Sequence, residues 1–288
     1  MTNNLKRAVV LGGGGHFGIA WELGYLRGLE EAGLPIREAD IFVGTSAGSQ
    51  ASVIVSSDKD WDLICKEQIE KEISEITPIS DEKMGELFKT FENIAKNSHS
   101  AKEWIAAEAE ISKKTQPFIS KEERLAMLKE RYGSGQARWN SKLRIVATSI
   151  EDIERQVFDE NSNVDILVAL QASGALQGVW PSVEINGKHF FDGGSFSMEN
   201  PDVFVDADKM LVLSTGLPVD VPYKLEDLLA QLEKKGTETS LVLPSEKTMN
   251  ILKDFNYNTV EAKIRPFVAQ AGREQGQAEA ALIKERWL

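Results

Sequence analysis

The chain has 288 residues, 42% of them hydrophobic, which is enough to bury a full core. Acidic side chains outnumber basic ones by 45 to 33, and the formal net charge of −12 comes without any long basic run. This balance argues against a nucleic-acid surface and against tight docking on anionic lipid. It leaves room for transient contact between an apolar lip and a membrane surface.

The cysteine content and the length of the apolar runs exclude further classes of protein. Cys65 is the only cysteine, which excludes an intramolecular disulfide and a cysteine-based zinc site, and we expect it to be a buried helix residue. No 18 apolar residues run together, and the apolar run before the first glycines is too short for a signal-peptide core. We therefore expect a cytoplasmic protein whose residues 1–288 form one domain.

The first predicted elements form a βαβ unit. Residues 8–11 (AVVL) predict a strand, a glycine turn follows, residues 17–32 predict a helix, and residues 41–43 (IFV) predict a second strand. The helix carries one apolar stripe and a second stripe of small residues, Ala20, Gly24 and Gly28. Because two strands joined through a helix run parallel, this unit predicts an α/β protein with a mostly parallel sheet buried on both faces.

Residues 58–132 change to a charge-rich helical pattern, which we interpret as a helical excursion outside the sheet. Two readings of this region stay open: a solvated helical layer, or a cap over an active site. Beyond it, strand and hairpin patterns return and then give way to helix after Pro218. The predicted elements are strands at 143–148, 156–158 and 210–214, a helix at 164–170, and a hairpin of 183–185 with 188–191 around Asn186 and Gly187.

The predicted strand at residues 41–43 runs into the segment GTSAG. Gly44 and Gly48 flank Ser46 at two places on each side, and residues 47–55 can continue as a buried helix. A serine on a tight strand-to-helix turn exposes its hydroxyl, and small neighbours let the two backbones pass closely. The segment is therefore a candidate nucleophile elbow, with an ordinary turn as the alternative.

The loop at residues 12–18 (GGGGHFG) also lies between a predicted strand and a helix. Backbone N–H groups and the helix dipole converge there and favour an anion, either a nucleotide phosphate or the oxyanion of a tetrahedral intermediate. Gly13, Gly15 and Gly18 match the dinucleotide pattern GxGxxG. Dinucleotide binding calls for an acidic residue after the second strand, whereas Asp40 precedes that strand and Ser46 follows it.

A serine nucleophile needs a base. The three histidines fit poorly: nothing after His189 supplies the late histidine of a serine, acid, histidine order, and we expect His16 to be a solvated loop residue. The best candidate is Asp192 in FFDGGS, at a predicted strand end before Gly193 and Gly194. A turn aspartate that bonds its own backbone is the alternative, and a base role requires burial or a hydroxyl partner to adjust its proton affinity.

Three segments together, VVLGGGGHFGIAWELGYLRGLEEAG, DIFVGTSAGS and ASGALQGVWPSVEINGKHFFDGG, resemble the patatin-like phospholipases in order and context. The resemblance extends from Arg7 to about Thr215. It implies a three-layer α/β/α fold and hydrolysis of acyl esters by a serine and aspartate dyad without histidine. Carried over by position, the implied nucleophile is Ser46, the base is Asp192, and the oxyanion-hole residues are Gly13, Gly14, Gly15 and Ala47. The elbow and loop glycines of these motifs are Gly18, Gly44, Gly48, Gly193 and Gly194.

The sequence departs from the family pattern at two positions. Phe17 stands where many members have a basic residue, and an apolar side chain there cannot help to hold a phosphate. Gln177 stands where relatives usually have proline, which we expect to loosen that loop without touching a catalytic group. Asn200 fits the family's pattern after DGG, and we expect it to fix the loop.

The leading hypothesis is a serine acyl hydrolase that cleaves lipid or other carboxylic esters through an acyl-enzyme on Ser46, with no metal or organic cofactor. The substrate is then an acyl ester, and no nucleic acid takes part. Two alternatives from other classes stay open: a nucleotide-binding protein that uses the glycine loop, and a catalytically silent scaffold that binds a lipid.

Overall fold

The computed structural model describes residues 5–71, 79–114, 116, 119–132, 137–216 and 224–288. Parts of two expectations lie outside the described residues: residues 72–78, 115 and 117–118 of the predicted helical region, and Pro218.

The described residues form an eight-stranded mixed sheet. Seven strands follow the order β5-β6-β3-β2-β1-β7-β8, and β4 pairs with β3 off this path. Strands β3, β2, β1, β7 and β8 are mutually parallel, whereas β4, β5 and β6 pair antiparallel. The strand bounds are β1 Arg7–Leu11, β2 Ile41–Thr45, β3 Leu143–Ser149, β4 Glu154–Phe158, β5 Val183–Ile185, β6 Lys188–Asp192, β7 Lys209–Leu213 and β8 Glu238–Val242. The expected mostly parallel sheet is confirmed.

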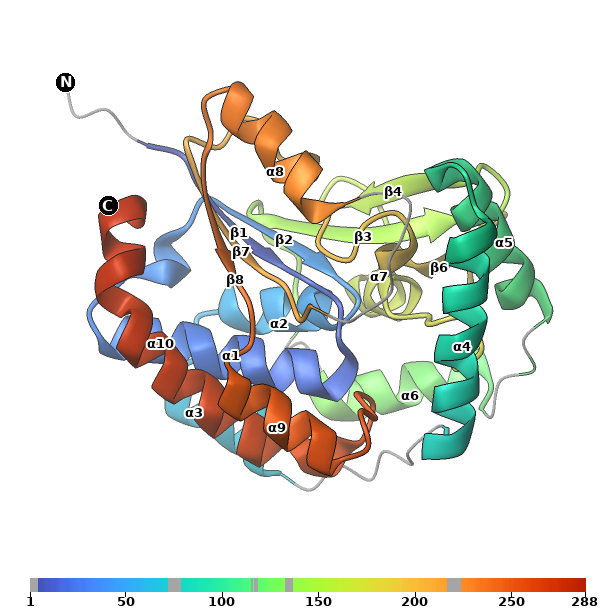
Figure 1. Cartoon of the computed structure of the whole chain (residues 1–288), viewed down its shortest axis with the longest axis horizontal. Coiled ribbons are helices and arrows are strands. Elements are labelled where there is room, and N and C mark those ends of the chain that lie inside the picture. Colours follow the sequence, from blue (N-terminus) through green and yellow to red (C-terminus); the bar gives the residue numbers. More distant parts are fainter. Residues whose placement is uncertain (1–4, 72–78, 115, 117–118, 133–136, 217–223) are drawn as a thin grey trace.

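Helices cover both faces of this sheet and one end of it (Figure 1). The α-helix bounds are α1 Gly15–Glu31, α2 Ala47–Val55, α3 Trp61–Cys65, α4 Asp81–Asn97, α5 Ala101–Lys114, α6 Lys121–Tyr132, α7 Ile166–Ser173, α8 Leu225–Lys234, α9 Glu246–Asp254 and α10 Arg265–Trp287. In Figure 1, α8 lies on one face, α1, α2 and α10 lie on the other, and α4, α5 and α6 gather at the right-hand end.

The central strand β1 shows why its sequence reads as a continuous apolar run. Val9 and Leu11 belong to the cluster that packs on α1, α2 and α10, whereas Ala8 and Val10 belong to the cluster on the α8 side. A strand buried on both faces needs apolar side chains at every position. The strand that comes first in the chain therefore lies at the centre of the three-layer core.

The region after Pro218 corrects the sequence reading. We expected only helix there, but β8 (Glu238–Val242) pairs in parallel with β7. Its polar and apolar residues alternate weakly, and it is an outer strand with partly exposed side chains, so its apolar signal was diluted. The hairpin around Asn186 and Gly187 is confirmed, and both turn residues have the positive φ that such two-residue turns require.

The small-residue stripe of α1 packs against α10. A Cβ atom added at Gly24 would lie 2.1 Å from the carbonyl oxygen of Ala269, and one at Gly28 would lie 2.2 Å from that of Arg273. From α10, a Cβ at Gly276 would lie 2.2 Å from the carbonyl oxygen of Tyr25. The helix backbones therefore approach so closely that only glycine fits at the crossing.

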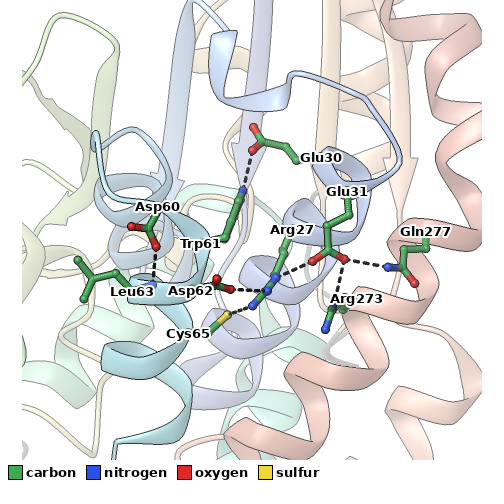
Figure 2. A network of polar contacts seen from close by, with 10 residues as sticks. All are labelled: Arg27, Glu30, Glu31, Asp60, Trp61, Asp62, Leu63, Cys65, Arg273 and Gln277. Carbon is green, nitrogen blue, oxygen red and sulfur yellow. Dashed lines mark hydrogen bonds and ion pairs between the residues drawn. The ribbon is translucent and has the colours of Figure 1, made fainter.

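Polar contacts surround this helix crossing and extend it to α3 (Figure 2). The guanidinium of Arg27 donates to Glu31, to Asp62 and to the sulfur of Cys65, and Glu31 also accepts from Arg273 and Gln277 on α10. Cys65 is half-buried at the end of α3, and burial raises the pKa of its thiol despite the hydrogen bond from Arg27. The cysteine thus contributes to helix packing.

We expect Gly24→Ala to lower the free energy of unfolding by about 3 kcal/mol, because the added methyl group forces α1 and α10 apart. Chemical denaturation measures the change. Gly85→Ala in α4 is the control: nothing lies within 4 Å of its added methyl group, so it should be neutral or stabilise the fold by up to about 1 kcal/mol. Equal stability of the two variants would contradict the close crossing.

Candidate active site

Ser46 occupies a sharp turn between β2 and α2. Its φ of 53° and ψ of −115° place it in a region that non-glycine residues rarely adopt. The flanking glycines make the turn possible, because a Cβ at Gly48 would lie 2.0 Å from the carbonyl oxygen of Leu11 and one at Gly44 would lie 2.5 Å from that of Gly48. The local geometry is that of the strand-to-helix elbow the sequence predicted.

Asp192 lies opposite this serine, at the end of β6. The Ser46 Oγ is 2.7 Å from Asp192 Oδ2, and the Gly194 N–H donates to Oδ1 at 2.8 Å. Strand β6 pairs with β3, and Gly193 lies so close to β3 that a Cβ there would be 2.3 Å from the carbonyl oxygen of Val146. Two residues 146 positions apart in sequence are thus brought into hydrogen-bond contact by the sheet.

The residue Asp192 is 5% exposed. Burial raises its pKa to about 6, although the hydrogen bonds from Ser46 and Gly194 favour the charged form and oppose the rise. A carboxylate with this pKa is mostly ionised at neutral pH and is a stronger base than an ordinary aspartate. The structure thus supplies the burial and the hydroxyl partner that a base role requires.

The glycine loop lies beside the serine and opens α1. Gly14 has a φ of 142° and Gly15 has a φ of 59°, which are conformations that favour glycine. Gly13 is next to the serine: a Cβ atom added to it would lie 3.6 Å from the Cβ of Ser46. The Gly13 N–H donates to the carbonyl of Met198 at 2.9 Å. Gly15 and Ala47 are the first residues of α1 and α2, where N–H groups have no partner within the helix.

A cavity of about 160 Å³ opens onto Ser46, Asp192 and the glycine loop. The helical excursion provides part of its walls: α4 contributes apolar side chains, α5 contributes Trp104 and Glu108, and α6 contributes Arg124 and Arg131. The loop before β5 adds Gln177 and Trp180. Of the two readings of residues 58–132, the structure supports a cap over the site, with α4, α5 and α6 at the end of the sheet shown in Figure 1.

Glu108 is a second buried carboxyl group in this cavity, 4% exposed. Burial raises its pKa to about 8, the nearby charge of Asp192 adds to the rise, and a hydrogen bond with Ser195 opposes it. Among the described residues no partner is found for its Oε2. At neutral pH the group is therefore mostly protonated and can donate a hydrogen bond into the cavity.

One of the three histidines, His16, does not lie where the sequence predicted it. His16 is not a solvated loop residue: it is the second residue of α1, is buried, lines the cavity and lies 3.2 Å from Arg131. The helix begins two residues earlier than its apolar pattern predicted, which turns the imidazole inward. His189 is exposed and pairs with Glu151, and His99 is also exposed, so neither approaches Ser46.

Two loop residues behind Asp192 are tightly held. Asn200 adopts the left-handed conformation and its amide donates to Thr45 and to the carbonyls of Gly193 and Ser197, so it fixes the loop as expected. Gln177 was expected to loosen its loop, but its amide donates to the hydroxyl of Ser195 and ties the two loops together.

Sequence reasoning missed Glu108, Arg124 and Arg131. Each is a charged residue in a helical region rich in surface charges, so its type alone gave no signal. A weak signal existed in α6, where Arg124 and Arg131 share a helix face with the fully buried Leu128. Charged residues on an apolar stripe indicate buried polar groups.

Two features are absent from the part of the chain that the structure describes. Neither a cluster of three or more metal-ligating His, Cys, Asp or Glu side chains nor a helix able to cross a membrane occurs among those residues.

Comparison with protein families matches residues 9–205 to the model described as patatin-like phospholipase. Comparison with curated proteins finds no significant match. Among solved structures, VipD from Legionella pneumophila is 13% identical with a TM-score of 0.44, over 94% of this chain and 67% of that one. The type III effector protein ExoU is 17% identical with a TM-score of 0.40, over 95% of this chain and 53% of that one, so this chain spans about half of its length.

A mostly parallel sheet flanked by helices, with a glycine loop and a strand-to-helix elbow meeting at one edge, defines a three-layer α/β/α protein. Because the family model covers more than half of the chain, the chain belongs to the patatin-like phospholipase family. It is accordingly a hydrolase.

The raised pKa of Glu108 makes the free energy of unfolding depend on pH. Between the ordinary glutamate pKa and about 8, the unfolded chain releases a proton that the folded chain keeps, so the free energy of unfolding falls as pH rises through this range. Glu108→Gln cannot titrate. We expect the melting temperature of Glu108→Gln, measured by thermal denaturation, to rise relative to that of the unchanged protein as the pH increases from 5 to 8.

Glu110→Gln on the same helix is the control for this prediction. Glu110 is exposed and its pKa is lowered by Lys113, so its replacement should not produce the same gain with rising pH. A constant difference between Glu108→Gln and the unchanged protein across this range would show that Glu108 does not hold its proton.

Proposed function

We propose that this hydrolase cleaves its ester through a Ser46 and Asp192 dyad and an acyl-enzyme intermediate. The observation that carries the proposal is the 2.7 Å contact between Ser46 Oγ and Asp192 Oδ2 inside a cavity, with the serine on a strained elbow. The family membership supports hydrolysis of lipid esters in general, and this contact supports the two residues by which it occurs.

The proposed reaction begins when Ser46 Oγ attacks the ester carbonyl and its proton passes to Asp192 Oδ2. The tetrahedral intermediate then carries a negative charge on the former carbonyl oxygen. N–H groups at the starts of α1 and α2 are suited to stabilise it, and we assign this role to Gly14, Gly15 and Ala47. Gly13 also belongs to the glycine loop, but its N–H donates to the carbonyl of Met198 and is therefore not a donor to the oxyanion in this conformation.

Collapse of the intermediate breaks the bond to the alcohol, and the Asp192 proton moves to the leaving oxygen. A water molecule then attacks the acyl group on Ser46 while Asp192 accepts one of its protons, and a second collapse releases the carboxylic acid and restores the serine hydroxyl. The same carboxylate acts as base and acid in each half of the cycle. This requires a pKa between that of an ordinary aspartate and neutral pH, which burial provides.

The apolar side chains of α4 support an acyl-binding role for the capped cavity, and the same cap is a candidate for transient contact with a lipid surface. The nucleotide alternative gains no support, because Asp40 accepts a hydrogen bond from the backbone of Arg7 instead of standing after β2. A catalytically silent scaffold would keep the fold but not a reactive serine, and the next experiment separates the two.

Exposure to a fluorophosphonate probe should add one adduct to the intact protein mass, because the dyad makes Ser46 nucleophilic. Ser46→Ala should abolish the adduct and lower hydrolysis of short and medium acyl esters by at least about 10³-fold. Ser57→Ala, two residues beyond the end of α2, should keep both properties. Hydrolysis by Ser46→Ala at the unchanged rate would overturn the proposal.

The pKa of Asp192 sets the expected pH dependence. The base must be ionised in the free enzyme, so kcat/KM should be level above pH 7 and fall by about tenfold per pH unit below pH 6. Stopped assays with a short acyl ester from pH 4.5 to 8 measure the profile, and circular dichroism at each pH checks that the fold is intact. A profile without an inflection near pH 6 would argue against Asp192 as the base.

A further inference from the structure

The cavity carries two guanidinium groups that the dyad mechanism does not use. We propose that Arg124 and Arg131 form a subsite for an anionic group of the substrate, so that the enzyme favours single-chain acyl esters bearing a phosphate near the scissile bond over their neutral counterparts. This inference rests on the proposed hydrolysis at Ser46 and names the substrate class of that same cavity.

Both arginines project from one face of α6. They are seven residues apart, which corresponds to two helical turns or about 10 Å along the helix axis. Each is more than nine-tenths buried, at 7% and 8% exposure, and each lines the cavity that contains Ser46. One wall of the cavity therefore presents two positive charges from a single rigid element.

Arg131 is fixed next to the catalytic loops. Its Nη1 donates to Oε1 of Gln50 at 2.7 Å, and Gln50 lies on α2 one helical turn after Ser46. Its Nη2 lies 3.2 Å from Nδ1 of His16, which is in the first turn of α1. Because a guanidinium only donates, His16 Nδ1 is the acceptor in this contact. The guanidinium charge thus sits between the beginnings of α1 and α2.

Arg124 holds the second charge in another part of the wall. Its Cζ lies 4.0 Å from the centroid of the Trp180 ring, a stacking geometry that orients the guanidinium. Trp180 lines the same cavity. An oriented guanidinium presents a fork of N–H donors that matches the oxygens of a phosphate.

The charge balance within the cavity favours an anion. Two carboxyl groups, Asp192 and Glu108, line it together with the two arginines among the described residues. Burial raises the pKa of Glu108 to about 8, so this group is mostly neutral at pH 7 and the arginines exceed the remaining carboxylate by one. In a chain with a formal charge of −12, this is a local reversal of sign.

The cavity size indicates how much of a lipid fits between these groups. A volume of about 160 Å³ is close to that of cavities that hold one benzene-sized ligand. It has room for the groups around one scissile bond beside the serine and not for two acyl chains. This is the basis for a single-chain ester in the proposal.

The test compares two substrates that differ only in the phosphate: monodecanoylglycerol and monodecanoylglycerol phosphate, both below their micelle concentrations. The unchanged protein should show the higher kcat/KM for the phosphate ester. Arg124→Met should lower kcat/KM for the phosphate ester by about tenfold more than for the neutral ester, because a charge-assisted hydrogen bond to the phosphate is lost. Arg131→Met should lower both values, and the phosphate ester further, since Arg131 also contacts His16 and Gln50.

Two further variants serve as controls. Lys129→Met removes a positive charge from the exposed side of the same helix and should leave both substrates unchanged. Arg124→Lys keeps the charge and should recover part of the preference, and it covers the case in which Arg124→Met does not fold. An equal loss on both substrates in Arg124→Met, or a preference of the unchanged protein for the neutral ester, would overturn the subsite.

Binding without turnover separates this inference from the proposed function. In the Ser46→Ala background, calorimetry should show decyl phosphate binding that Arg124→Met weakens by about tenfold and Lys129→Met does not affect. Decanol and inorganic phosphate should bind more weakly than decyl phosphate. Equal binding of inorganic phosphate would mean a free-anion site and would also overturn the proposal, whether or not Ser46 proves to be the nucleophile.

Discussion

The candidate active site depends on one close approach of backbones, that of the first turn of α2 against the end of β1. The Gly48 N–H donates to the carbonyl of Gly12 at 2.8 Å, and no side chain fits at Gly48. This contact joins the elbow to the glycine loop and sets the beginnings of α1 and α2 side by side. The serine hydroxyl, the N–H groups of both helices and the cavity then meet at one edge of the sheet.

The partner of the serine depends on a second sheet contact, since the antiparallel pairing of β6 with β3 carries Asp192 to the elbow. A carboxylate can replace a histidine only if its surroundings raise its proton affinity without neutralising it at pH 7. Burial does this here and the two hydrogen bonds limit the rise. The imidazole closest to the site, that of His16, is engaged with Arg131 instead. Phe17 is fully buried in the core, and the positive charge next to the glycine loop is that of Arg131 on α6, which contacts His16.

The sequence predicted what local patterns encode. The first βαβ unit, the elbow glycines and the Asn186 turn each have a short signal tied to a backbone requirement, and each is present. The small-residue stripe of α1 was visible but its cause was not, because the partner helix lies more than 240 residues later in the chain. Strand β8 escaped because an outer strand needs fewer apolar residues. The cavity residues of α5 and α6 escaped because burial of a charged side chain depends on tertiary packing, which no local pattern records.

The dyad is tested most directly by the rate at which a fluorophosphonate labels Ser46 in Asp192→Asn compared with the unchanged protein. An amide at residue 192 keeps the shape of the site but cannot take the serine proton. The account predicts that labelling of the unchanged protein accelerates with an apparent pKa near 6, and that labelling of the variant is slower by at least about 10³-fold and independent of pH. Labelling of Asp192→Asn at the rate of the unchanged protein would contradict it.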